Sequence, residues 1–178
     1  LTPWKKDRIL VDPFCGSGTF PIEAAMMAAD MAPGLNRHFL AESWEHLIPK
    51  ECWEDAREEA RERVNLDIET DIQGFDIDAA AIKARANAKM AGVDRLIHFQ
   101  QRPVSELRHS KPFGFIVTNP PYGERIEEKS NLPALYREIG ESYKGLDRWS
   151  MYLITAYDKA ENDIGRKADK NRKIYNGM

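Results

Sequence analysis

One stretch decides the fold, and it reads Ile9-Leu10-Val11-Asp12-Pro13-Phe14-Cys15-Gly16-Ser17-Gly18-Thr19. Its first three residues form a continuous apolar run, which is typical of a buried parallel strand. The run ends in an acid and enters a turn with two glycines, whose backbone can adopt positive φ and approach a ligand closely. A helix that begins near Thr19 would direct its free N–H groups at the same turn. The stretch therefore predicts a ligand-binding loop at the edge of a parallel sheet.

A second stretch of the same kind lies far along the chain, where the apolar run 113–118 is followed by Asn119-Pro120-Pro121-Tyr122. We expect this run to be a strand, and we expect another strand over 72–77 to carry Asp76 at its end. The carboxyl ends of parallel strands gather at one edge of a sheet. Asp12, Asp76 and Asn119 should therefore meet there, although they are far apart in the sequence.

The rest of the chain alternates apolar runs with segments of helical periodicity. Further strands are predicted over 96–100 and 151–155, and helices from Thr19 toward residue 32, around 53–64, after a capping Asp78 and from 132 to 146. The inward faces predicted for the last two helices are Ala79, Ile82, Ala86 and Met90, and Leu132, Leu135, Tyr136, Ile139, Tyr143 and Leu146. This alternation predicts an α/β fold, namely a Rossmann-like, doubly wound, mostly parallel sheet with helices on both faces.

The 178 residues suit a single domain, and residues 33–70 are expected to be an insertion within it. Inside that insertion, the weakly periodic residues 35–52 are expected to form a lid or another irregular segment. The chain begins at Leu1 and stops at Met178, so we expect a piece of a longer protein that is truncated at both ends.

Composition and charge narrow the class of protein. A net charge of −3 without a long apolar run is typical of a soluble protein that lacks a membrane segment. Basic residues gather over 159–178, and those from Lys167 to Lys173 could either contact phosphates or form a solvated loop. Cys15 and Cys52 are too few for a disulfide framework, and the four histidines show no metal-binding spacing. We therefore expect a reduced, cytoplasmic compartment and no metal.

The residues around the glycines narrow the choice of ligand. A phosphate-binding P-loop is disfavoured because no lysine follows Gly16 and Gly18. A dinucleotide site is weakened because Pro21 stands where that motif has its third glycine. Asp76, at a strand end, is placed to bind ribose hydroxyls. A plain tight turn is the alternative that the glycines alone leave open.

The Asn-Pro-Pro-Tyr segment fits a planar exocyclic amine, which is a poor nucleophile because its lone pair is conjugated into the ring. The amide oxygen of Asn119 and the carbonyl of Pro120 could accept both N–H bonds of such an amine and orient its nitrogen. Tyr122 could stack on a base taken out of its helix. Beside a cofactor loop, this segment indicates methylation of an exocyclic amine by S-adenosylmethionine, although an ordinary Pro-Pro turn would explain the segment by itself.

In combination these motifs resemble class I S-adenosylmethionine-dependent methyltransferases. Within that class they are similar to the bacterial ribosomal RNA guanine-N2 methyltransferases that also carry an RNA-binding THUMP domain. The likeness covers nearly the whole chain. The segments that carry it are DPFCGSGT (12–19), APGLNR (32–37), GFDID (74–78), NPPYGER (119–125) and KADKNRKIYNG (167–177). Members of the family are often labelled adenine-specific DNA methylases because they share the Asn-Pro-Pro-Tyr signature.

The resemblance implies an enzyme that uses S-adenosylmethionine to methylate an exocyclic amine, above all N2 of a guanine in 23S ribosomal RNA. It implies ribosomal RNA as partner and a THUMP domain in the full-length protein. The cofactor site would comprise Asp12, Gly16 and Gly18 at the methionine end, Asp76 at the ribose and Ile77 at the adenine, with Phe14 and Thr19 in the same loop. The target base would meet Asn119, Pro120 and Tyr122. Cys15 would not act as a nucleophile, because nitrogen methylation needs no covalent adduct with the enzyme.

One position departs from the family pattern, because Pro103 stands where the family usually has an Asp that binds the adenine amine of the cofactor. That contact then falls to a backbone amide or to Gln101. Three rival functions stay open: N6-adenine methylation of DNA, methylation of a protein glutamine amide, and a non-catalytic RNA-binding module that retains the fold. Within the family, the Asn that opens the signature and the Gly-Glu-Arg of 123–125 favour guanine in RNA.

Overall fold

A five-stranded sheet forms the centre of the computed structural model, which describes residues 2–123 and 130–174. The strands run in the order β3-β2-β1-β4-β5, and every neighbouring pair is parallel. Their bounds are β1 Leu10–Asp12, β2 Ile72–Asp76, β3 Ile97–Gln101, β4 Phe115–Thr118 and β5 Ser150–Leu153. The predicted parallel α/β sheet is thus confirmed, with strand ends that differ from the expected ones by a few residues.

The strand order reverses direction at β1, the central strand. Asp12 pairs in register with Gly74 of β2 on one side, and Val11 pairs with Ile116 of β4 on the other. Such a reversal separates the loops that follow the two strands and leaves a crevice at the carboxyl edge of the sheet, where ligands of doubly wound folds bind. The loops after β1 and β4 flank this switch point.

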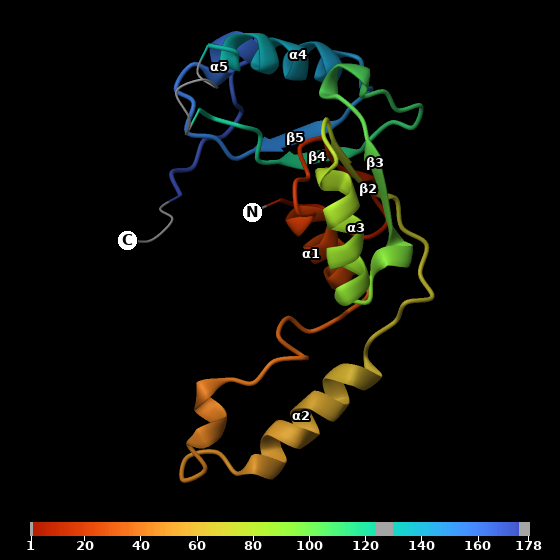
Figure 1. Cartoon of the computed structure of the whole chain (residues 1–178), viewed down its shortest axis with the longest axis vertical. Coiled ribbons are helices and arrows are strands. Elements are labelled where there is room, and N and C mark those ends of the chain that lie inside the picture. The colour runs from red at the N-terminus through yellow and green to blue at the C-terminus, as the bar shows by residue number, and fades with distance from the viewer. Residues whose placement is uncertain (1, 124–129, 175–178) are drawn as a thin grey trace.

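Helices cover both faces of the sheet, as Figure 1 shows. On one face α1 (Thr19–Ala28) and α3 (Ala80–Met90) pack on β1, β2 and β3, and on the other α4 (Leu132–Lys144) and α5 (Ala160–Ile164) pack on each other and close the second layer. Short 3-10 turns occupy Leu40–Ser43, Asp94–Leu96 and Val104–Glu106. Side chains of each strand alternate between the layers: Leu10 belongs to the α1 and α3 core, whereas Val11 belongs to the opposite one.

The face predicted for α4 is confirmed, but the face predicted for α3 is wrong. Along α4, Tyr136 and Ile139 are buried as expected. Among the α3 side chains that the structure describes, which leave out residues 80–82, Ala84 and Ala88 are buried, whereas Ala86 is exposed and Met90 is 84% exposed. The reason is close packing: a Cβ added to Gly18 would lie 3.0 Å from the Cβ of Ala84, so only a small side chain fits there. The helix also starts after Ala79 at the N-cap, one residue beyond the predicted cap Asp78.

Residues 33–70, which we call the arm, join α1 to β2 and extend away from the sheet (Figure 1). They contain the 3-10 turn at Leu40–Ser43 and α2 (Lys50–Glu62), none of whose residues is buried. Within the described part of the chain, no helix has the length and apolar character needed to cross a membrane.

Candidate cofactor and acceptor site

The loop after β1 is shaped by its two glycines. Gly16 and Gly18 adopt φ values of 50° and 88°, the left-handed region that favours glycine. The Gly18 N–H donates to the Cys15 carbonyl at 2.7 Å, which closes a tight turn at the start of α1. A side chain built on Gly18 would contact Ala84, Ile22 and Phe99 at 3.0–3.2 Å, whereas one built on Gly16 would meet no atom within 4 Å. The backbone at Gly16 is therefore open to a ligand, and the backbone at Gly18 is packed against the core.

Asp76 fixes this loop to the end of β2. Its Oδ2 accepts the Gly16 N–H at 2.9 Å, and its Oδ1 accepts the Asp78 N–H at 3.2 Å. An ionised carboxylate offers about four acceptor positions, so two remain for ribose hydroxyls. The half-buried Asp76 can thus hold the loop and a ligand at the same time.

Asp12, which is expected at the methionine end of the cofactor, is enclosed at the end of β1. Its side chain is 1% exposed, and its Oδ1 accepts the Thr118 hydroxyl at 2.6 Å and the Phe14 N–H at 3.1 Å. Burial raises the pKa of Asp12 to about 7, with a smaller contribution from the Asp76 charge, and outweighs both hydrogen bonds. Asp12 therefore connects the end of β1 to the end of β4 and shapes the site from below.

The segment after β4 presents the predicted acceptor groups. The Asn119 side chain is exposed, Pro120 is fully buried and Tyr122 is half-buried. Among residues 2–123 and 130–174, neither the Asn119 amide nor the Pro120 carbonyl has a hydrogen-bond partner, and the exposed Asn119 amide can accept from a ligand. The predicted Glu124 and Arg125, and residues 175–177 of the final family segment, lie outside the described residues.

The other residues expected at the cofactor site lie on both sides of the glycine loop. Ile77 is 70% exposed, which leaves a flat apolar surface at the end of β2. Thr19 is exposed, and its hydroxyl lies 3.2 Å from that of Ser17. Phe14 packs into the α4 and α5 core, and Gln101 donates its side-chain amide to the Ile77 carbonyl at 3.0 Å. The exposed Ile77, the spare acceptors of Asp76 and the open backbone at Gly16 together fit a nucleoside with a polar tail.

Cys15 lies in the same loop without the character of a nucleophile. It is 5% exposed, and burial, together with the charges of Asp12 and Asp76, raises the pKa of its thiol to about 12. A thiol with that pKa stays protonated at neutral pH, and the thiolate is the reactive form. The structure therefore agrees with a packing role for this cysteine.

Sequence reasoning missed the hydroxyl groups beneath the two loops. Thr118 is fully buried and donates to Asp12, and Tyr136 is fully buried beneath the Asn-Pro-Pro-Tyr segment. The signal for Thr118 was present, because a hydroxyl in an otherwise apolar strand needs a hydrogen-bond partner. Tyr136 was predicted only as a core residue of its helix, since helical periodicity does not reveal what a hydroxyl contacts.

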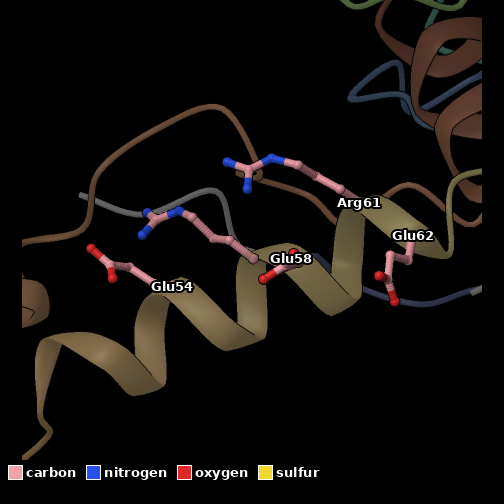
Figure 2. Close-up of a pocket in the computed structure, with 5 residues that line it drawn as sticks. Glu54, Glu58, Arg61 and Glu62 are labelled. Atoms are coloured by element: carbon pink, nitrogen blue, oxygen red, sulfur yellow. The ribbon is translucent and has the colours of Figure 1, made fainter.

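A hollow of about 630 Å³ lies far from these loops, along α2 in the arm. Figure 2 shows its lining side chains, Glu54, Glu58, Arg61 and Glu62, projecting from a single helix. Acids and bases three or four residues apart on a helix form a solvated ladder. This hollow is therefore an open trough between charged side chains, and the candidate site lies at the carboxyl edge of the sheet.

A parallel sheet with a glycine loop and an Asn-Pro-Pro-Tyr loop on either side of its switch point defines the class I methyltransferase type. The chain belongs to the family described as RMKL-like, methyltransferase domain, whose model matches residues 1–178. It is 46% identical to the "Putative RNA methyltransferase YpsC" of Bacillus subtilis over 100% of its own length and 46% of that protein. It is also 40% identical to the "Ribosomal RNA large subunit methyltransferase K/L" of Shewanella baltica, over 94% of the chain and 24% of that protein.

A solved structure supports the same family. SMU.472, described as a putative methyltransferase complexed with SAH, superposes with a TM-score of 0.92 at 41% identity, over 99% of the chain and 47% of that protein. The chain thus spans about half the length of that protein and of its Bacillus relative.

Proposed function

We propose that this chain is the methyltransferase domain of an enzyme that moves a methyl group from S-adenosylmethionine to N2 of a guanine in 23S ribosomal RNA. The observation that carries the proposal is that the exposed Asn119 amide and the open backbone of Gly16 lie on the loops that follow the neighbouring strands β4 and β1, at the switch point. The ribosomal RNA relative and the SAH complex of the solved relative support the substrate class and the cofactor.

The cofactor assignment follows from the groups around Gly16. S-adenosylmethionine, when bound, supplies an electrophilic methyl group on its sulfonium. Gly16 and the N-terminus of α1 would receive its methionine carboxylate. Asp76 would accept from the ribose, and Ile77 would cover one face of the adenine. Gln101 and neighbouring backbone amides would complete adenine recognition in place of the Asp that Pro103 replaces.

The acceptor assignment follows from the chemistry of a planar amine. Asn119 and Pro120 would accept its two N–H bonds, fix the direction of its nitrogen and favour the charge that develops as that nitrogen becomes tetrahedral. Tyr122 would stack on the base once it has left its helix. We also propose that RNA is delivered by a THUMP domain elsewhere in the full-length protein, since the chain covers only part of each relative.

The deciding experiment compares nucleosides from cells with and without the gene. Mass spectrometry should show loss of N2-methylguanosine from 23S ribosomal RNA in the deletion strain, and its return when the gene is restored. Loss of N6-methyladenine from DNA instead would support the rival methylase. Loss of methylated glutamine from protein, or no loss at all, would point to the other two alternatives.

A single substitution tests the acceptor assignment in the purified, complete gene product. Asn119→Ala should lower kcat by about a hundredfold or more, because a preorganised polar contact to the reacting group is removed. The affinity for S-adenosylhomocysteine, measured by calorimetry, should stay unchanged. Normal turnover by this variant would contradict the role of Asn119.

A further inference from the structure

Tyr136 lies beneath the Asn-Pro-Pro-Tyr segment, although it belongs to the separate helix α4. It is fully buried. Its hydroxyl donates to the Pro121 carbonyl at 3.3 Å and lies 2.5 Å from the hydroxyl of Thr155, which follows β5. Its ring also packs against Tyr157, with ring centroids 4.8 Å apart. A polar atom of α4 thus contacts the backbone of the loop that would hold the target base.

The direction of these hydrogen bonds can be assigned by counting protons. The backbone N–H of Tyr157 donates to the Thr155 hydroxyl oxygen at 3.0 Å. Tyr136 has one hydroxyl proton, and the Pro121 carbonyl can only accept. If that proton goes to Pro121, the Thr155 proton must go to the Tyr136 oxygen. The bonds therefore form a one-way chain from the Tyr157 amide through two hydroxyls to the Pro121 carbonyl.

The loop backbone is stiff enough that the hydrogen bond at Pro121 also fixes the acceptor groups of Asn119 and Pro120. Asn119 and Pro120 each precede a proline, so both are restricted to extended conformations. Each proline ring also fixes its own φ. With so few free torsions, holding the Pro121 carbonyl at Tyr136 sets the direction of the Pro120 carbonyl, one residue earlier.

The other end of the loop is anchored as well. The Ile154 N–H donates to the Thr118 carbonyl at 3.0 Å, and the Thr118 hydroxyl donates to Asp12. The acceptor segment is therefore held before Asn119 by β1 and β5, and after Pro120 by Tyr136. Burial, the stronger effect, raises the pKa of Tyr136 above its ordinary value even though the bond to Thr155 lowers it. The hydroxyl is thus protonated, and able to donate, at neutral pH.

We propose that Tyr136 is a positioning residue for methyl transfer: through the Thr155–Tyr136–Pro121 hydrogen bonds it holds the acceptor loop in the geometry that receives the target amine. This role rests on the proposed function. Tyr136 itself touches neither the cofactor nor the base, because its side chain is enclosed by α4, the loop and the segment after β5.

The test compares Tyr136→Phe with Tyr143→Phe in the complete gene product. Both changes delete one hydroxyl from α4, and the Tyr143 hydroxyl also donates to a backbone carbonyl, that of Trp149, at 2.7 Å. Tyr136→Phe should lower kcat for methylation of RNA from the deletion strain by about tenfold to a hundredfold, since a displaced catalytic group costs that much. Tyr143→Phe should keep kcat within about twofold of the wild type. The affinity for S-adenosylhomocysteine should not change in either variant.

The conservative and disruptive variants of Thr155 test the chain of bonds itself. Thr155→Ser keeps a hydroxyl and should retain kcat, whereas Thr155→Val should reproduce the loss seen in Tyr136→Phe. Full activity in Tyr136→Phe, or an equal loss in Tyr143→Phe, would overturn the positioning role. An inactive wild-type enzyme would instead refute the proposed function, and the role of Tyr136 would fall with it.

Discussion

Two carboxylates accept hydrogen bonds of similar length, yet their pKa values are shifted in opposite directions. One lies at the carboxyl edge of the sheet and the other in the arm. Asp12 accepts from Thr118 at 2.6 Å, and burial raises its pKa to about 7. Glu42 accepts from Arg57 at 2.6 Å, and that bond, followed by the Phe39 N–H, lowers its pKa to about 2. The difference lies in the partner and the surroundings: Thr118 brings no charge to the fully buried Asp12, whereas Arg57 brings a positive charge to the half-buried Glu42.

This contrast separates the roles of the two regions. At the sheet edge, buried polar groups such as Asp12 and Thr118 hold the loops in fixed positions. If one of these hydrogen bonds is lost, bulk water cannot reach the buried group to replace it. In the arm, the Glu42–Arg57 ion pair keeps about a fifth of each side chain exposed, so water competes with it. Substitutions at the edge should therefore have much larger effects than matched substitutions in the arm.

The largest effect is expected from Asp12→Asn. The pKa of Asp12 is raised from 3.8 in the ordinary state to about 7 in the folded state. Between these values the folded protein keeps a proton that the unfolded chain has lost, so the free energy of unfolding of the wild type falls as the pH rises. Asparagine keeps the acceptor oxygen without the charge, and the variant should be more stable at pH 8 by on the order of 4 kcal/mol.

Urea denaturation of the wild type and of Asp12→Asn at pH 5 and pH 8 measures this difference. The gain at pH 5 should be less than half of the gain at pH 8, because the unfolded chain has already lost most of its proton at pH 5. A variant that is destabilised equally at both values would show that the Asp12 carboxylate is needed as an anion.

The next effect is expected from Gly18→Ala. A left-handed φ and a Cβ 3.0 Å from Ala84 should together destabilise the fold by about 3 kcal/mol. Gly92→Ala is the matched control, because Gly92 has φ +76° with no atom within 4 Å of an added Cβ. It should cost about 1 kcal/mol. Equal losses in thermal denaturation would mean that packing against α3 does not matter.

A smaller effect, on ligand binding, is expected from Asp76→Asn. The asparagine side chain has only one acceptor oxygen, so its amide nitrogen would face either the Gly16 or the Asp78 N–H. Affinity for S-adenosylhomocysteine should fall by about tenfold to a hundredfold, because hydrogen bonds to a charged group are lost. Asp55→Asn, on the exposed surface of α2, should leave the affinity unchanged. Calorimetry on both variants would refute the ribose role if Asp76→Asn bound normally.

The smallest effect is expected in the arm, from Arg57→Met. Without the guanidinium, the pKa of Glu42 should rise from about 2 toward its ordinary 4.5. In the wild type, the contribution of Glu42 to stability is present above its ordinary pKa and is lost as the pH falls toward 2. Hydrogen exchange should quicken over residues 37–44, while kcat and cofactor affinity stay unchanged. A loss of turnover would show that the arm takes part in the reaction.

Local sequence patterns predicted the strands and helices, and the buried face of α3 is the part that they predicted wrongly. Apolar runs predicted every strand to within a few residues, and the strong periodicity of 132–146 predicted the buried face of α4. The face of α3 was predicted wrongly because alanines stand on most sides of that helix, so periodicity could not choose among them. Contact with Gly18 and Phe99 selected Ala84 and Ala88 instead.

The placement of the candidate site residues was predicted in part for the same kind of reason. Asp76 and Asn119 were predicted to lie at one edge of the sheet because each lies at the end of a predicted strand, and parallel strands bring their carboxyl ends together whatever their order. Their partners could not be predicted, since Thr118 and Asp12 are separated by 106 positions and their bond depends on β1 and β4 being neighbours.

By itself the sequence determined which segments become strands and helices, where the glycine and Asn-Pro-Pro-Tyr loops begin, and to which family the chain belongs. These properties depend on short-range periodicity, turn residues and motifs, which are local. Only the tertiary structure decided that Asp12 is enclosed rather than exposed, that β1 lies between β2 and β4, and that Tyr136 supports a loop from another part of the chain. Burial and long-range hydrogen bonds depend on the packing of whole elements, and no window of sequence contains them.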